Sequence, residues 1–172
     1  MASSGQVASE GWAERVERLA RIIPGVGAYQ DREGLRDTDK RVRMYVADLL
    51  AQAARDLEPV QRSLADGGRL DRLPVLDRLC RLLATLVDRI RFARYGFSGV
   101  FAEQKIRAKE LQDFHDFDLR LVQEIPGLRR HVQAVGRTAD AEEFARLVRT
   151  AEESIGGFES LLEERDKLAR GL

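Results

Sequence analysis

Apolar residues recur along most of the chain at steps of three and four positions, the spacing that gathers side chains on one face of an α-helix. Strict alternation of apolar and polar residues, the mark of a half-buried strand, is scarce. Turns rich in proline and glycine separate the periodic segments. The pattern predicts an all-α fold: an antiparallel bundle of about four long helices, preceded by a short N-terminal amphipathic helix.

The short helix is expected to span residues 10–23 and to follow a disordered tail of small polar residues, 1–9. Pro24-Gly25 ends it, because proline cannot continue the hydrogen-bond ladder and glycine accepts a left-handed cap. Basic and acidic residues balance along this helix, which weakens its attraction to anionic lipid. This balance favours packing against the bundle, with a membrane surface as the alternative. Its apolar residues are Trp12, Val16, Leu19, Ala20 and Ile23.

The next two predicted helices are joined by an Asp-Gly-Gly turn and should therefore lie antiparallel. One begins at a cap formed by Asp37 or Thr38 and ends near residue 65, with a kink or local break at Pro59. The other spans about 70–95 and carries a seam like that of a coiled coil. Such a seam pairs helices within one chain or between chains, so a homo-oligomer is possible. The seam consists of Leu73, Leu76, Cys80, Leu83, Val87 and Ile90.

Two more helices complete the bundle, and together with the others they make a single domain over residues 10–172. The fourth helix begins near residue 100 or 102 and runs to 125, and Pro126-Gly127 then interrupts or kinks it. Leu128, Val132 and Val135 continue the pattern to Gly136. The last helix spans about 139–169 with Thr138 as its cap. Within it, Gly156-Gly157 marks either close helix packing or a hinge.

Composition narrows the classes of function. The chain has 29 basic and 29 acidic residues, so no overall field attracts nucleic acid, which is not an expected partner. Its one cysteine, Cys80, cannot form an internal disulfide and lies in an apolar stretch that suits a core residue. No apolar run is long enough to span a bilayer, and no secretory signal is apparent. We therefore expect a cytoplasmic protein.

The most unusual local feature is the stretch 89–109, which has six basic residues, one acidic residue and four aromatic residues around a Gly-Phe-Ser-Gly turn. Basic and aromatic side chains at one tip of a bundle would bind an acidic protein surface, phosphorylated headgroups or single-stranded nucleic acid. The alternative is that the aromatic rings close the end of the core while the arginines are solvated. The candidate partner-binding residues are Arg89, Arg91, Arg94, Tyr95, Phe97, Phe101 and Lys105.

Acidic residues surround His115 on the fourth helix, at Asp113, Asp116 and Asp118. A dimetal bundle would need an inward Glu-x-x-His motif on each of two helices, and the sequence has none. We therefore predict no metal site, and expect Asp118 to form a partly buried ion pair with Arg89 or Arg94 that fixes helix register.

Catalytic and cofactor motifs are also missing from the sequence. Neither His115 nor His131 has a serine or cysteine nearby in a strained turn of the G-x-S-x-G type. The glycines of Pro24-Gly25-Val26-Gly27 follow a helix, whereas a dinucleotide-binding fingerprint follows a strand. We expect no catalytic residues and no cofactor. In this loop, Pro24, Gly25 and Tyr29 remain candidates for contact with the core or with a partner.

Three segments carry a resemblance to a known family: residues 23–33 (IPGVGAYQDRE), 36–40 (RDTDK) and 94–101 (RYGFSGVF). They resemble an uncharacterised bacterial family of small helical proteins with an I-P-G-x-x-x-Y loop and an R-Y-G-[FY]-[SA]-G turn. Genes of that family lie beside membrane-domain proteins of the band-7 (stomatin-like) type. The resemblance covers about residues 12–122, transfers no catalytic residues, and implies an accessory role near a membrane scaffold.

From these observations we expect a non-catalytic interaction protein, an adaptor or scaffold component that offers its surface and the basic aromatic tip to a protein partner. The alternative is a peripheral membrane or polyanion-binding module that uses the first helix and residues 89–109. A third possibility is an enzyme or metal carrier with a site around Asp113, His115, Asp116 and Asp118.

Overall fold

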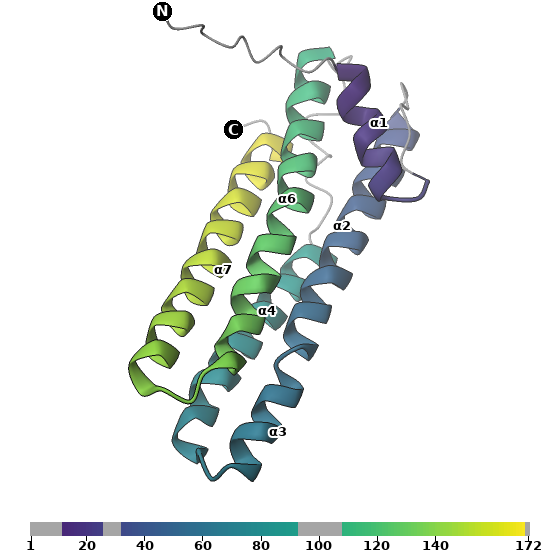
Figure 1. Cartoon of the computed structure of the whole chain (residues 1–172). Coiled ribbons are helices and arrows are strands. Elements are labelled where there is room, and N and C mark those ends of the chain that lie inside the picture. The colour runs from purple at the N-terminus through teal and green to yellow at the C-terminus, as the bar shows by residue number, and fades with distance from the viewer. Residues whose placement is uncertain (1–11, 26–31, 93–107, 171–172) are drawn as a thin grey trace, which may run out of the picture.

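The computed structural model describes residues 12–25, 32–92 and 108–170, and over these residues every regular element is helical (Figure 1). The predicted all-α bundle is confirmed for this part of the chain. Its α-helices are α1 (Trp12–Ile22), α2 (Arg32–Arg55), α3 (Glu58–Asp66), α4 (Leu73–Arg91), α6 (Ala108–Ala134) and α7 (Ala141–Arg170). Two short 3₁₀ turns lie between them, η1 (Leu70–Arg72) and η2 (Val135–Arg137). None of the helices described here has the length and apolar character that crossing a bilayer requires.

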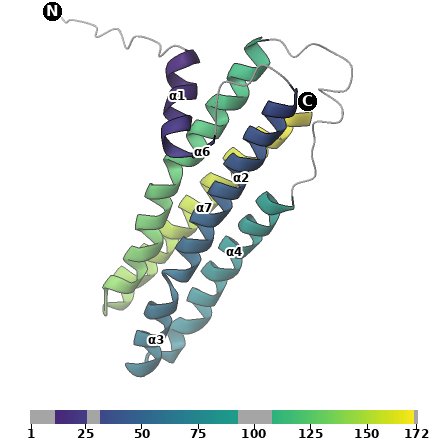
Figure 2. The same ribbon diagram turned by 90° about the vertical axis from the view of Figure 1, so that its right-hand side faces the viewer.

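The bundle is built from two antiparallel helix pairs (Figures 1 and 2). In one pair α2 and its continuation α3 lie beside α4, and in the other α6 lies beside α7. The pairs meet mainly where α2 packs on α6, and α4 approaches α7 less closely. The short α1 lies on α6 at the end where α2 begins. α4 ends lower down, beside the middle of α2, where Arg91 pairs with Asp48. We call the region from the start of α2 to the end of α4 the α2/α4 end.

A continuous apolar core runs through the bundle, and the steps of three and four in the sequence account for it. Within the seam predicted for α4, Leu76, Leu83, Val87 and Ile90 are buried, whereas Leu73 and Cys80 are half-buried against the core. Burial raises the pKa of the Cys80 thiol, with a further contribution from Asp77. The largest fully buried side chains are Leu19, Leu50, Leu57, Leu76, Leu79, Leu83, Ile90 and Ile125.

The predicted break at Pro59 is confirmed, but the predicted start of its helix is wrong. α2 ends at Arg55, and α3 begins at Glu58 with Pro59 in its first turn, where proline needs no hydrogen-bond partner for its missing N–H. α2 begins at Arg32, upstream of the expected cap, because residues 32–36 contain no proline and only one glycine. Thr38 therefore lies inside the helix, 2% exposed, and its Oγ1 has no hydrogen-bond partner.

Of the interruption or kink predicted at Pro126-Gly127, the interruption does not occur, because α6 continues through both residues to Ala134. Ile125 and Leu128, which flank this dipeptide, are each only 2% exposed. Their burial offsets the one backbone hydrogen bond that proline removes. The start predicted for this helix lies among residues 100–107, outside the described residues.

Two features of α7 differ from expectation. Its N-cap is Asp140, whose Oδ1 accepts from the N–H of Glu143 at 2.7 Å, while Thr138 Oγ1 accepts from the N–H of Asp140 at 3.1 Å. α7 also passes unbroken through Gly156 and Gly157, and a Cβ on either would meet nothing within 4 Å. No close packing within the described chain therefore requires them, although together they make the helix about 2 kcal/mol less favourable than alanines would.

The end of the bundle opposite the α2/α4 end, where η1 and η2 lie, is held by Arg72; we call it the sealed end. The Arg72 guanidinium donates to the carbonyls of Thr138 (3.3 Å) and Ala139 (2.6 Å) and lies 4.6 Å from the centre of the Phe144 ring. Close by, Gly136 packs so tightly on α3 that a Cβ there would lie 2.6 Å from Cγ2 of Val60. At this end, therefore, backbone carbonyls of the turn before α7 find their hydrogen-bond donor within the chain.

Candidate interaction surface

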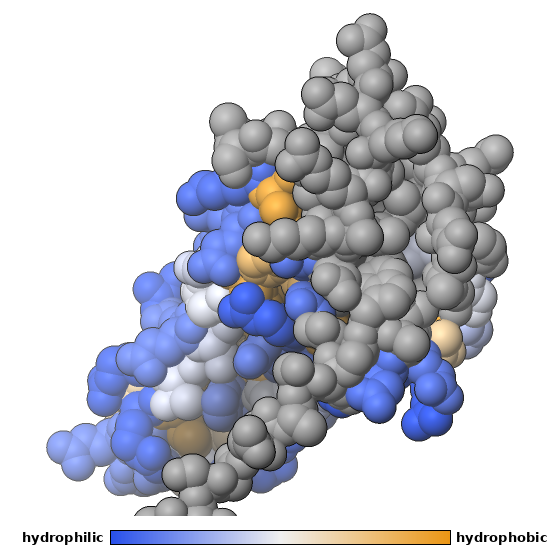
Figure 3. Space-filling model, turned by 90° about the horizontal axis from the view of Figure 1, so that it is seen from above, coloured by the Kyte–Doolittle hydropathy of each residue, from blue (hydrophilic) through white to orange (hydrophobic). Residues whose placement is uncertain are grey.

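The α2/α4 end exposes apolar side chains. Phe92, the residue that caps α4, is 77% exposed, and Met44 on α2 is 40% exposed. Two contacts bring these stretches of chain together: Arg91 Nη2 lies 2.9 Å from Asp48 Oδ1, and the buried Arg43 donates to the carbonyl of Ile90 at 3.3 Å. Figure 3 looks down on the molecule from above and shows a few hydrophobic atoms exposed among hydrophilic ones.

Phe92 is exposed because of its position relative to the core stripe of α4. The buried residues Leu83, Leu86, Val87 and Ile90 follow the helical period, and Phe92 comes two positions after the last of them. Its N–H still bonds to the carbonyl of Asp88 at 2.9 Å, so the backbone is fixed while the ring points off the stripe. The sequence pattern counted Phe92 among the four aromatic residues of the stretch 89–109 but did not place it among the partner-binding residues, although its offset from the stripe was a usable signal.

Of the residues predicted for the basic aromatic tip, the structure describes only Arg89 and Arg91. Arg94, Tyr95, Phe97, Phe101 and Lys105 lie outside the described residues. Arg89 is directed toward α7, where its guanidinium lies 3.3–3.5 Å from three carboxylates, and its side chain is 32% exposed. It therefore serves chiefly to link α4 to α7. The three carboxylates are those of Glu159, Glu163 and Asp166.

The loop after α1 begins as the sequence predicted. Gly25 has a φ of +80°, which confirms the left-handed cap. The Arg41 guanidinium fills the space beside it, so that a Cβ on Gly25 would lie 2.6 Å from Arg41 Nη1. α1 itself is docked, because Leu19 is fully buried and Ile23 is 3% exposed. Pro24 is exposed, and Tyr29 lies outside the described residues.

Asp118 forms a buried ion pair, but not with the predicted residue Arg89. Its Oδ1 accepts from Nε of Arg165 at 2.7 Å, and the two side chains are 2% and 3% exposed. The predicted pairing with Arg89 is wrong because Asp118 faces α7, the closest neighbour of α6, and not α4. Arg94, the other predicted partner, lies outside the described residues.

A second polar cluster joins α2 to α6. Asp56 accepts from Nε and Nη2 of Arg129 at 2.6 and 3.1 Å, and from the side-chain amide of Gln133 at 2.8 Å. The hydrogen bond from Arg129 is the main reason why the pKa of Asp56 lies below its ordinary value of 3.8. This cluster lies where α2 gives way to α3, and it fixes that break against α6.

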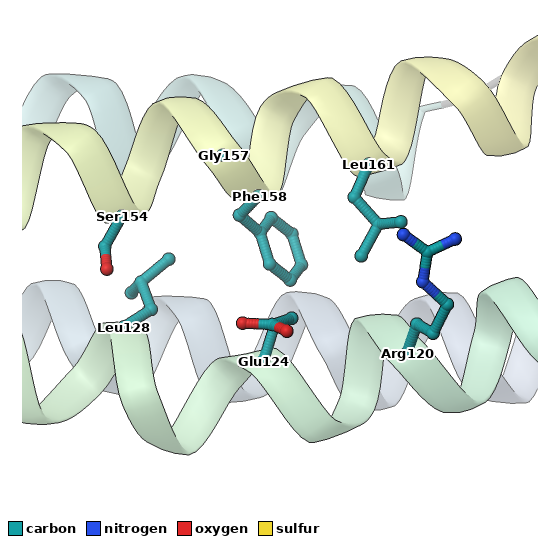
Figure 4. Close-up of a pocket in the computed structure, with 7 residues that line it drawn as sticks. All are labelled: Arg120, Glu124, Leu128, Ser154, Gly157, Phe158 and Leu161. Carbon is teal, nitrogen blue, oxygen red and sulfur yellow. The ribbon is translucent and has the colours of Figure 1, made fainter.

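Between α6 and α7 lies a groove of about 290 Å³ (Figure 4). Leu128, Phe158 and Leu161 line it together with the polar side chains of Arg120, Glu124 and Ser154, and Gly157 leaves one stretch of its wall without a side chain. The sequence places no serine near a histidine in a strained turn, but in the fold Ser154 Oγ lies 2.6 Å from Nδ1 of His131. Ser154 is in the middle of a helix, where backbone N–H groups already bond within the helix and cannot serve as an oxyanion hole. We therefore interpret this pair as a link between α6 and α7.

The acidic residues around His115 form no group that the structure identifies as a metal site. Among the described residues, no three His, Cys, Asp or Glu side chains are placed to hold a metal ion. Asp118 is turned into the ion pair with Arg165, and the side chain of His115 lies outside the described part of the chain.

Comparisons with known proteins, made against family models, curated proteins and solved structures, found no significant match to this chain. The function proposed below therefore rests on the residues and geometry of the chain itself.

Proposed function

We propose that this protein is a non-catalytic interaction module, an adaptor or scaffold component that binds a protein partner through the α2/α4 end. The observation that carries the proposal is the 77% exposure of Phe92 on a backbone fixed at the end of α4. A phenylalanine that is 77% exposed gains little for the fold, whereas aromatic anchors dominate the energy of protein interfaces. Met44, 40% exposed on α2, follows Arg43, whose side chain donates to the carbonyl of Ile90 near the end of α4.

The charges at this end suit a partner that is apolar with an acidic rim. Lys40 and Arg41 are exposed on α2, and Arg91 is exposed at the end of α4. Arg91 already pairs with Asp48, so it should add little to the affinity for an acidic partner and serve mainly to orient it. The association with band-7 proteins that the family resemblance implies stays a prediction, and such a protein is one candidate partner.

The membrane alternative depends on α1 as much as on the tip. Leu19 and Ile23, two residues of its apolar face, are buried against the bundle, so inserting this face into lipid would require α1 to leave its site. This geometry favours a protein partner at the α2/α4 end over a lipid surface. Co-sedimentation with vesicles containing phosphatidylserine tests the alternative, since lipid-driven binding would fall steeply with salt.

Site-specific crosslinking in the native host tests the proposal. The photoreactive residue benzoyl-phenylalanine replaces Phe92 in one variant and Leu70 in a matched control, because Leu70 is 60% exposed but lies at the sealed end. We expect one discrete protein adduct at position 92 and none at position 70, and we expect Phe92→Ser to abolish co-purification of that protein. Equal adducts from both positions, or none from position 92, would reject the α2/α4 end as the binding surface.

A further inference from the structure

We infer that two copies of this chain associate across the groove between α6 and α7, related by a two-fold axis that runs perpendicular to the helices. This interface is distinct from the α2/α4 end and goes beyond the proposed function. Three observations support it: the groove itself, the glycine pair in α7, and the arrangement of charges on α6.

No side-chain packing inside the described chain requires the glycine pair. A Cβ on Gly156 or Gly157 would meet nothing within 4 Å, yet both residues lie in the middle of a helix that alanine would stabilise. Glycine on an exposed helix face lets a second backbone approach closely. Gly157 opens directly onto the groove, which has the buried residues Phe158, Leu128 and Leu161 along its walls (Figure 4).

The charges of the groove identify the occupant. Arg120 and Glu124 are exposed, lie one turn apart on α6, and project into the space beside α7 (Figure 4). Within the described chain no ion pair joins them, and the order of arginine before glutamate is the less favourable one for pairing along a helix. Arg120 is instead held over the Phe117 ring, 5.2 Å from its centre.

A two-fold axis perpendicular to the helices converts these two charges into a self-complementary set. It places α6 antiparallel to α6 of the second copy, so that Arg120 faces Glu124 of the second copy and Glu124 faces its Arg120. One pair of residues thereby supplies two intermolecular ion pairs. An unrelated partner would need its own matching pair of charges, whereas a second copy has it by symmetry.

Sedimentation velocity of the purified full-length chain over a range of concentrations tests the inference. We expect a dimer that dissociates on dilution. Arg120→Glu should raise the dissociation constant by roughly tenfold or more, because it places like charges opposite each other at two points. The double variant Arg120→Glu/Glu124→Arg should restore dimerisation, since exchanging the two charges preserves the symmetry. Arg130→Glu, a matched charge reversal at an exposed position of α6 outside the groove, should leave the dissociation constant unchanged.

The glycines supply an independent measurement. Gly156→Ala/Gly157→Ala should raise the melting temperature of the monomer and at the same time weaken the dimer, two opposite effects that loss of folding cannot produce. A wild-type chain that stays monomeric at every concentration would overturn the inference. So would a dimer that Arg120→Glu does not weaken, or one that the charge-exchanged variant does not restore.

Discussion

The two ends of the bundle differ in where their side chains find partners. At the sealed end, Arg72 donates to two backbone carbonyls and Gly136 leaves just enough space for Val60. At the α2/α4 end, the backbone of Phe92 is fixed but its ring is 77% exposed. Substitutions at the sealed end should therefore change stability, and substitutions at the α2/α4 end should change binding. The comparison teaches that stabilising contacts and an exposed binding surface can lie in separate regions of one bundle.

The largest loss of stability is expected between the two ends, at the buried ion pair of α6 and α7. Asp118→Ala leaves the Arg165 guanidinium buried without this carboxylate, and we expect it to lower the free energy of unfolding by about 3–5 kcal/mol. Urea denaturation measures the change. Asp118→Ala/Arg165→Met should recover much of the lost stability, because it also removes the buried guanidinium that has lost this carboxylate. Failure to recover it would mean that the arginine is not the cause.

At the sealed end, Arg72→Ala should lower the free energy of unfolding by about 2–4 kcal/mol, because the carbonyls of Thr138 and Ala139 lose a charged donor. The control is Arg62→Ala, an exposed arginine of the neighbouring α3, for which a change below about 0.5 kcal/mol is expected. Equal effects from the two variants would show that Arg72 does not hold this end.

Asp56→Asn should lower the free energy of unfolding by about 1–2 kcal/mol at neutral pH, because the Arg129 guanidinium then faces a neutral amide in place of a carboxylate. The pKa of Asp56 is lowered in the folded state, so its contribution is present above the pKa of the unfolded chain and is lost as the pH falls through the folded value. The difference between wild type and variant, measured by urea denaturation, should therefore shrink below about pH 4. A difference that is constant from pH 7 to about pH 3 would contradict the assigned cause.

The smallest effect is expected at the α2/α4 end itself. Phe92→Ser should change the free energy of unfolding by less than about 0.5 kcal/mol, because the ring loses little contact within the chain. If Phe92→Ser lowered the free energy of unfolding as much as Arg72→Ala does, the proposed distinction between the two ends would be wrong.

Much of the fold could be predicted from the sequence because apolar periodicity is set by the core. Leu76, Leu83 and Ile90 lie where their spacing placed them, and Pro59 breaks its helix as expected. Helix ends were less predictable, since Asp37, Thr38 and Thr138 all have the chemistry of a cap and the sequence alone does not show which N–H groups need one. Pro126 stays within α6 because the burial of its neighbours outweighs the tendency of proline to end a helix.

The polar contacts of the site could be predicted only in part. The sequence indicated that Asp118 would pair in the interior, but the identity of Arg165 as its partner depends on which helices are neighbours. The pairs Asp56 with Arg129 and Ser154 with His131 join residues far apart in the chain, for which a single sequence offers no signal of distance. The exposure of Phe92, in contrast, could have been predicted from the sequence, because Phe92 falls outside the apolar stripe of α4.

Hydrogen–deuterium exchange of the full-length chain, alone and with the protein captured through position 92, tests the central claim most directly. The account predicts slower exchange on binding in residues 40–48 of α2 and 88–92 of α4, with no change in residues 67–73 at the sealed end. Protection confined to residues 67–73, or to the part of α7 that lines the groove with α6, would contradict it.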